Sequence, residues 1–142
     1  MHKPFACGEE APIVVLVVQE EETVRRAVVA HLQLAGFEVV EAVDADTALG
    51  VLHGSLVDAV CCGLRVPGSM DGLALVRWIH RNQPEVMTVL TAGSDNVVPI
   101  LGRRGIFLAE PYRLRALEQA LRRALRGSSR TQPSHDSAPR VA

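Results

Sequence analysis

The stretch "VDAVCCGLRVPGSMDG", residues 57–72, carries the signals that decide the fold of this chain. Its apolar run at 58–64 is short and is typical of a strand buried inside a parallel sheet. A Pro-Gly turn follows the run, and Asp71 then stands where a helix N-cap is expected. The segment therefore predicts a buried strand, a turn and a helix, in that order.

Four other short apolar segments flank this one in the sequence. They are "IVVLVV" (13–18), "FEVV" (37–40), "MTVLTA" (87–92) and "IFLAE" (106–110). All four predict buried parallel strands, and amphipathic helical patterns lie between them. Strands that alternate with helices favour an α/β sandwich around a parallel sheet. Functional groups gather at the carboxyl ends of the strands in such sheets, so candidate site residues are sought there.

The first helical pattern ends at Gly36, which is expected to be the C′ residue. Its apolar face comprises Val24, Ala27, Val28, His31, Leu32 and Ala35. We interpret His31 as a packed histidine at the edge of the core, since no second His, Cys or carboxylate is placed to join it. The next helix is expected to start at Asp44 or Asp46 and to end at Gly54.

Two later helices have clear apolar stripes. The helix capped by Asp71 has Leu73, Val76, Trp78 and Ile79, and the last helix has Leu114, Leu117, Leu121, Ala124 and Leu125. Between them, residues 95–105 leave room for a fourth helix of only one or two turns. Pro99 has to fall within its first turn, where a missing N–H does no harm.

The chain has 142 residues and is expected to form one domain at 12–126, with an N-terminal extension at 1–11 and a disordered C-terminal tail at 127–142. Lys and Arg total 15 against 16 for Asp and Glu, so the charge gives no sign of nucleic-acid binding. No apolar run is long enough for a membrane span, which favours the cytoplasm. The adjacent Cys61 and Cys62 fit neither a disulfide framework nor a metal motif, and buried free thiols are expected.

Several motifs follow one another along the chain: "VLVV", "AGFEVVEA", "LRVPGSMDG", "VLTAG" and "FLAEPY". With them the chain resembles the receiver domains of bacterial two-component response regulators, from about Ile13 to Arg126. The resemblance implies a flavodoxin-like, doubly wound five-stranded parallel sheet of strand order 2-1-3-4-5, with five helices of which the fourth is short.

Receiver domains of that family accept a phosphoryl group from a histidine kinase on an aspartate at the end of the third strand. Two acidic residues after the first strand help to hold Mg²⁺, a Thr or Ser ends the fourth strand, and a Lys precedes a proline after the fifth. The metal ion and the lysine neutralise the negative charge that collects when a carboxylate meets a phosphoryl donor, and the hydroxyl binds a phosphoryl oxygen.

Three of these positions have changed in this chain. The acceptor aspartate aligns with Gly63, which has no side chain, and the lysine aligns with Glu110, which reverses the charge. The acidic pair aligns with Gln19 and Glu20, so that one carboxylate has become a neutral amide. Mg²⁺ is usually held by one or two carboxylates together with phosphate oxygens. The magnesium site is therefore expected to be degenerate, and no metal or cofactor is expected.

Other positions keep the residue types of the family. The hydroxyl position is Thr91, and Pro111 and Phe107 also match the pattern. The resemblance implies a cis peptide bond between Glu110 and Pro111. The degenerate phosphorylation pocket that the resemblance implies comprises Gly63, Thr91, Glu110 and Pro111.

Neighbouring groups are not expected to replace the missing aspartate. Glu21 and Glu22 suit the positive end of a helix dipole. Asp58 starts its strand at the opposite end of the sheet, and Asp71 is expected to cap a helix. Cys62 has no His, Lys or Arg visibly placed to lower its pKa.

These features predict a stand-alone pseudo-receiver, a signalling module that binds a protein partner without an aspartyl-phosphate step and is not an enzyme. An alternative is an atypical receiver that a histidine kinase still phosphorylates at a non-standard acceptor. The expected partner is a histidine kinase or another regulator of a bacterial signalling pathway, or a second copy of the chain, with neither nucleic acid nor membrane involved. The predicted partner face comprises Phe107, Tyr112, Arg113 and Arg115.

Overall fold

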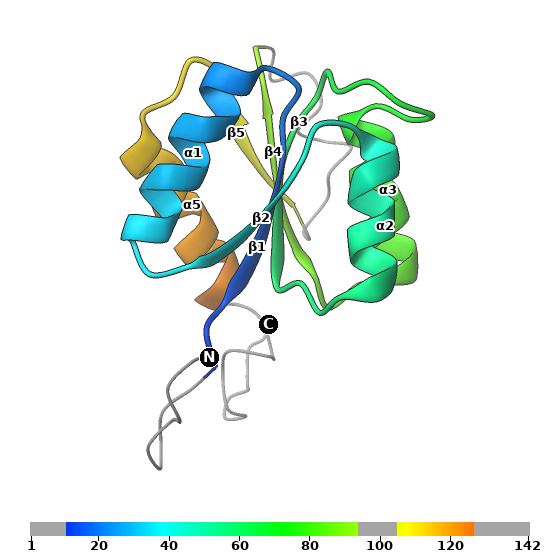
Figure 1. The fold of residues 1–142 in the computed structure, drawn as a ribbon, viewed down its shortest axis with the longest axis horizontal. Helices are drawn as coiled ribbons and strands as arrows, with labels where there is room; N and C mark the ends of the chain where they lie inside the picture. The colour runs from blue at the N-terminus through cyan, green and yellow to red at the C-terminus, as the bar shows by residue number, and fades with distance from the viewer. Residues whose placement is uncertain (1–10, 94–104, 127–142) are drawn as a thin grey trace.

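The computed structural model describes residues 11–93 and 105–126, which form a five-stranded parallel sheet between two layers of helices (Figure 1). The strands are β1 (Val14–Val18), β2 (Glu38–Ala42), β3 (Ala59–Gly63), β4 (Met87–Ala92) and β5 (Gly105–Ala109). The helices are α1 (Glu22–Leu34), α2 (Ala45–Gly54), α3 (Gly72–Asn82) and α5 (Leu114–Arg126). Helices α1 and α5 cover one face of the sheet, and α2 and α3 cover the other (Figure 1).

The strand order is β2-β1-β3-β4-β5, which confirms the predicted flavodoxin-like topology. Each predicted strand is present within a residue or two of its expected ends, and all neighbouring strands pair in parallel. The chain runs from β1 through α1 to β2 and then crosses the other face of the sheet through α2 to β3, so that β2 and β3 lie on either side of β1. In sheets of this kind a crevice forms at the carboxyl ends of the strands beside that switch point.

Some predictions fall on residues outside the described ranges. They are nearly all of the N-terminal extension, the short fourth helix expected within 95–105, and the tail from residue 127. These expectations stay predictions. Of the helices in the described part of the chain, none is long and apolar enough to cross a membrane.

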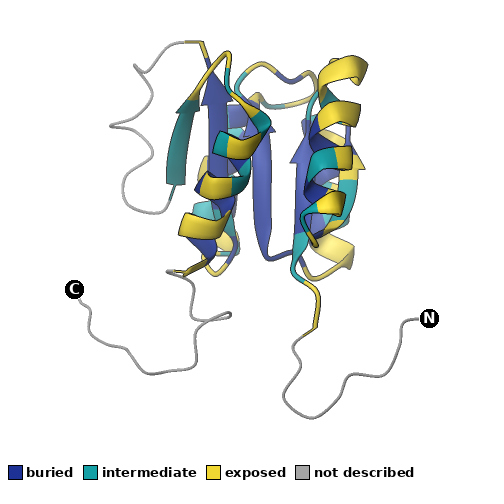
Figure 2. Ribbon diagram, turned by 90° about the vertical axis from the view of Figure 1, so that its left-hand side faces the viewer, coloured by how far each residue is buried: buried dark blue, intermediate teal, exposed yellow. Residues whose placement is uncertain are grey.

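The core has two halves, one on each side of the sheet. Leu16 and Val18 of β1 pack toward α2 and α3, while Val15 and Val17 pack toward α1 and α5. All four side chains are fully buried, and the central strands of Figure 2 are accordingly dark blue. Burial on both faces explains why the strands are continuous apolar runs in the sequence.

The ends of the helices follow the predicted capping residues. Asp44 accepts a hydrogen bond from Thr47 N at 2.7 Å and caps α2. Asp71 accepts one from Ala74 N at 2.9 Å and caps α3. Gly36 follows α1 with a φ of +105°, a conformation that favours glycine. These contacts confirm both N-caps and the C′ glycine.

The apolar face of α1 is only partly buried. Val28 and Leu32 lie in the core, whereas Val24 is 40% exposed and Ala27 is exposed as well. Helix α1 begins just beyond the carboxyl end of β1, so its first turns lie at the sheet edge. Val24 and Ala27 therefore line a pocket at that edge instead of filling the core.

A hydrogen-bonded group joins α1 to α5. His31 Nε2 donates to Oε1 of Glu118 at 2.9 Å, and Arg122 Nε donates to Oε2 at 3.0 Å. Because an ionised carboxylate can only accept, the His31 nitrogen carries the proton. Arg122 also donates to the carbonyl oxygen of Ala35 at 2.9 Å and lies over the ring of Phe37. The prediction that no carboxylate joins His31 was wrong, since Glu118 comes from a helix 87 residues further along the chain.

Replacing Glu118 by glutamine is expected to lower the temperature of thermal unfolding at neutral pH. Hydrogen bonds from His31 and Arg122 hold the pKa of the Glu118 carboxyl below its usual 4.5. A depressed carboxyl pKa contributes stability that is complete above the unfolded-state value and is lost as the pH falls through the folded-state value. The gap in unfolding temperature between wild type and variant should therefore narrow below pH 4.5, which calorimetry at a series of pH values would measure.

A matched control for this change is Glu85→Gln. Glu85 is an exposed carboxylate in the turn before β4. The same loss of charge there should leave the unfolding temperature nearly unchanged. An equal decrease in unfolding temperature for the two variants would contradict the role assigned to Glu118. So would a difference between wild type and Glu118→Gln that does not narrow in acid.

Candidate functional site

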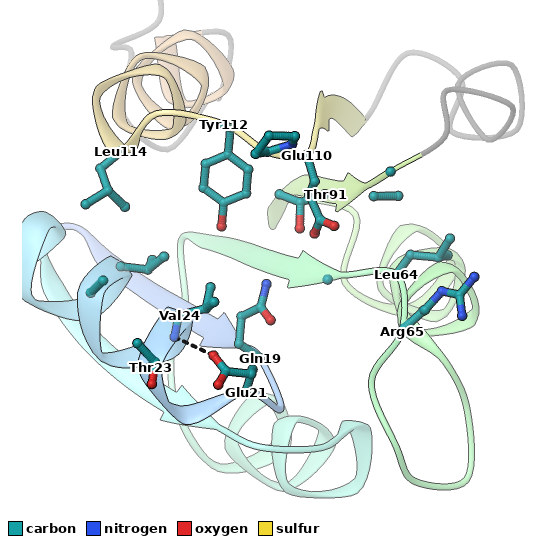
Figure 3. A pocket seen from close by; sticks show the side chains of 16 residues that line it. Gln19, Glu21, Thr23, Val24, Leu64, Arg65, Thr91, Glu110, Tyr112 and Leu114 are labelled. Carbon is teal, nitrogen blue, oxygen red and sulfur yellow. Dashed lines mark hydrogen bonds between the residues drawn. The ribbon is translucent and has the colours of Figure 1, made fainter.

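The carboxyl ends of the strands border a pocket with a volume of about 900 Å³. Gln19 follows β1, Gly63 ends β3, and Thr91 pairs with Gly63 from β4. Glu110 and Pro111 follow β5, and the peptide bond between them is cis, as the resemblance implies. The structure brings these five residues together at one edge of the sheet (Figure 3).

The acceptor position of the pocket is bare backbone. A Cβ atom at Gly63 would lie 3.0 Å from Nε2 of Gln19 and 3.4 Å from its Cδ. The amide of Gln19 thus covers the place where a carboxylate side chain would begin. Position 63 offers no nucleophilic group to a phosphoryl donor.

The residues at this edge do not fit the magnesium ion that the resemblance implies. Glu20 is exposed and does not line the pocket, and Gln19 offers an amide where a carboxylate is needed. Within the described residues, no group of three His, Cys, Asp or Glu side chains could hold a metal ion. Near-octahedral coordination by carboxylate oxygens is therefore not available from these side chains.

Arg25 fixes the backbone of the loop after β1. Its Nη1 donates to the carbonyl oxygens of Gln19 at 3.2 Å and Glu20 at 3.3 Å. Its Nε donates to Oε1 of Glu41 at 2.9 Å, and only 14% of the Arg25 side chain is exposed. A largely buried guanidinium makes strong charge-assisted hydrogen bonds. The loop after β1 is thus held by a residue that the sequence did not single out, because two of its partners are backbone carbonyls and the third, Glu41, lies 16 residues further along the chain.

Two hydroxyl groups at the pocket have no hydrogen-bond partner among the described residues. The whole side chain of Thr91, including Oγ1, is buried, and so is the phenolic oxygen of Tyr112. Burial raises the pKa of Tyr112, so its hydroxyl stays protonated at neutral pH. Both hydroxyls point into the space between α1 and the loop after β5 (Figure 3). The pocket therefore holds unused hydrogen-bonding capacity.

The residues of the predicted partner face are spread over two sides of the sheet. Phe107 packs against the half of the core that α2 and α3 cover, whereas Tyr112 packs against the α1 and α5 half. Arg113 and Arg115 are exposed at the start of α5. Tyr112 lines the pocket. The sequence did not show this, because the direction of the Tyr112 side chain depends on the cis peptide bond just before it.

Three carboxylates that were considered as replacements for the missing aspartate make structural contacts instead. Glu21 caps α1 by accepting a hydrogen bond from Val24 N at 2.9 Å, and Asp71 caps α3. Asp58 accepts a hydrogen bond from Val14 N at 2.8 Å, at the amino ends of the strands. These contacts confirm the helix-start position predicted for Glu21, the cap predicted for Asp71 and the position at the opposite end of the sheet predicted for Asp58.

Both cysteines of β3 are free and buried, as expected. Burial raises the pKa of Cys61 to about 12 and also raises that of Cys62. The thiolate form is therefore scarce at neutral pH, and a buried thiol is a poor nucleophile.

The loop from β3 to α3 is tied to the start of α2. Ser69 donates to the carboxylate of Asp46 through its N at 3.1 Å and its Oγ at 2.7 Å. Ala45 N donates to the carbonyl oxygen of Pro67 at 3.1 Å. Gly68 has a φ of +118°, and a Cβ there would lie 3.0 Å from Oδ2 of Asp46. Asp46, the alternative candidate for the cap of α2, anchors this loop instead.

Comparison with known proteins relates the chain to a protein family. The sequence model of the family described as "Response regulator receiver domain" matches residues 15–103. The chain is 33% identical over 114 residues to "C4-dicarboxylate transport transcriptional regulatory protein DctD" of Rhizobium meliloti, covering 78% of this chain and 25% of that protein. It is 27% identical over 119 residues to "Probable transcriptional regulator ycf27" of Guillardia theta, covering 82% of this chain and 46% of that protein. The chain thus spans less than half the length of either relative.

Solved structures share the same fold. The receiver domain of NtrX from Brucella abortus superimposes with a TM-score of 0.72 at 32% identity, covering 80% of this chain and 99% of that one. A CheY-like response regulator receiver domain protein from Methanospirillum hungatei JF-1 gives a TM-score of 0.77 at 18% identity, covering 86% and 100%. The second likeness supports the fold alone.

Proposed function

Because this chain belongs to the response regulator receiver domain family, we propose that it is a two-component signalling module whose receiver works without accepting a phosphoryl group. The observation that carries the proposal is Gly63, which stands at the acceptor position under the amide of Gln19. The receiver fold is retained around it, including its strand order and the cis bond before Pro111.

The charges at the pocket support the same proposal. Glu110 occupies the place of the family's lysine, and Glu21 also lines the pocket. Arg65 is the one cation among the described residues that line it. Two like unit charges about 4 Å apart repel by roughly 4 kcal/mol at an effective dielectric constant near 20. A phosphoryl group would therefore meet repulsion where the family supplies attraction.

Incubation with acetyl phosphate and Mg²⁺ is expected to leave the mass of the intact protein unchanged. The physical reason is that no carboxylate stands at position 63 and that, in the described part of the chain, no cluster of carboxylates could hold the metal ion. Intact-protein mass spectrometry under neutral conditions measures the outcome directly. A stoichiometric gain of one phosphoryl group that is stable in acid and labile in base would overturn the proposal.

We propose further that the module acts by binding a protein partner, either a histidine kinase, another regulator or a second copy of this chain. The exposed guanidinium groups of Arg113 and Arg115 at the start of α5 support this proposal, because they offer charge for partner recognition.

Reversing the charge of Arg115 should weaken partner binding at least about tenfold, whereas reversing that of Arg77 on α3 should not. Arg77 is a suitable control because it is exposed on the opposite face of the sheet. Cross-linking and pull-down from the native cell extract identify the partner, and titration with that partner compares Arg115→Glu with Arg77→Glu. Equal binding by wild type and Arg115→Glu would remove Arg115 from the interface.

A further inference from the structure

We propose that the pocket at the carboxyl edge of the sheet binds a small uncharged organic molecule with an aromatic body and a hydroxyl or carbonyl group. The inference rests on the proposed function, in which this pocket no longer carries phosphoryl chemistry. Its volume of about 900 Å³ lies within the roughly 300–1,000 Å³ that is usual for small-molecule sites.

The walls of the pocket are apolar and lie on two separate elements. One wall is the exposed start of α1, where Val24 and Ala27 lie on the apolar side of the helix but border the pocket instead of the core. The opposite wall is formed by Pro111, the ring of Tyr112 and Leu114 (Figure 3). An apolar molecule between these walls would remove their surface from water, and flat rings pack well against tyrosine and proline.

The floor supplies directional polar contacts. Thr91 Oγ1 and the Tyr112 hydroxyl are buried, lack partners among the described residues and point into the same space (Figure 3). Both oxygens are closed off from solvent, so a ligand hydroxyl or carbonyl reaches one of them only after a rotation of its side chain, and the hydrogen bond then formed offsets the cost of an unpaired buried hydroxyl. Each hydroxyl can donate and accept, and the Gln19 amide above Gly63 can do the same. A neutral polar group on the ligand matches this set.

The charge of the pocket disfavours anions. Glu21 and Glu110 line it and outnumber Arg65, the cation among its described lining residues. An anionic ligand would be repelled at close range, whereas an uncharged one avoids that cost. Phosphate esters and carboxylates are therefore excluded from the proposed ligand class.

Two glycines border the pocket. Gly63 places no side chain on the floor, and a Cβ at Gly93 on the rim would meet no atom within 4 Å. The amide of Gln19 covers the bare floor at Gly63, whereas the rim at Gly93 is open.

Fluorescence titration of the full chain with Nile red, an uncharged aromatic ketone, tests the proposal. We expect saturable one-to-one binding that naphthol displaces, and weaker binding of the anionic dye anilinonaphthalene sulfonate. Absence of saturable Nile red binding, or tighter binding of the sulfonate dye, would overturn the proposal. Mass spectrometry after acetyl phosphate treatment tests the proposed function separately, so failure of one is distinguishable from failure of the other.

Ala27→Trp is expected to weaken Nile red binding at least about tenfold by filling the pocket. Ala30→Trp is the matched control, because Ala30 is also exposed on α1 but does not line the pocket. Circular dichroism of both variants verifies the fold. Unchanged binding in Ala27→Trp would place the dye elsewhere and overturn the proposal.

Thr91→Val tests the hydroxyl without changing the shape of the side chain. The variant should bind naphthol about fivefold more weakly, because it lacks a hydrogen-bonding group. It should also unfold at a higher temperature than wild type, since a buried unpaired hydroxyl is removed. Unchanged naphthol affinity in this variant would contradict the hydrogen bond assigned to Thr91.

Discussion

Replacing Gly72 by alanine is expected to lower the free energy of unfolding by about 3 to 5 kcal/mol. A Cβ atom at Gly72 would lie 2.0 Å from the carbonyl oxygen of Gly63, 2.8 Å from its carbonyl carbon and 2.9 Å from Cα of Leu64. All three are backbone atoms of the end of β3 and the residue after it, so no side chain can turn aside to relieve the contact. Either α3 or the end of the central strand has to move.

Urea denaturation of wild type and of Gly72→Ala measures the difference in the free energy of unfolding. Gly50→Ala is the control, because Gly50 lies inside α2 and a Cβ there would meet no atom within 4 Å. That change should stabilise the protein by about 0.5–1 kcal/mol, since alanine favours the helix more than glycine does. A Gly72→Ala variant as stable as wild type would show that α3 can shift without loss of packing.

Restoring three side chains is expected to convert the chain into a phosphoryl acceptor. The variant combines Gln19→Asp, Gly63→Asp and Glu110→Lys, which returns the acceptor, the second acidic group and the cation of the family pattern. Acetyl phosphate and Mg²⁺ should then add one phosphoryl group per chain, which intact mass spectrometry would detect. The carboxylates supply the metal ligands, and the lysine neutralises charge at the phosphoryl group.

The single variant Gly63→Asp should gain only a small fraction of the phosphoryl groups that the triple variant gains. The new Cβ would lie 3.0 Å from Nε2 of Gln19, which the flexible amide can relieve, but Glu110 would still repel the donor. A triple variant with Asn at position 63 is the control and should not be labelled, because an amide is not a nucleophile. Full labelling of Gly63→Asp alone would show that Gln19 and Glu110 do not oppose phosphoryl transfer.

The sequence predicted the strands, the helices and the gathering of the carboxyl strand ends from local signals and from the family pattern. Buried strands such as 13–18 and 87–92 are continuous apolar runs, and capping residues such as Asp71 act within one turn of the chain. The family pattern then placed Gly63 and Glu110 at one edge, because the carboxyl ends of parallel strands lie side by side.

Contacts between distant elements were beyond such reasoning. His31 meets Glu118 because two helices on one face of the sheet lie together, and nothing local to either residue signals the contact. Val24 and Ala27 follow a helical apolar pattern but lie beyond the edge of the sheet, a limit that depends on where β1 ends. Periodicity reports which face of a helix is apolar, but not how far the core extends beneath it.

The hydrogen bonds between Ser69 and Asp46 have a consequence for the motions of the domain. Together with the bond from Ala45 to Pro67, they tether the tip of the β3–α3 loop to the first turn of α2. The tether removes the independent freedom that a surface loop of this length usually has. We therefore expect the loop and the first turn of α2 to move together, so that a partner that loosens α2 would also loosen the segment that leads from Gly63 to α3.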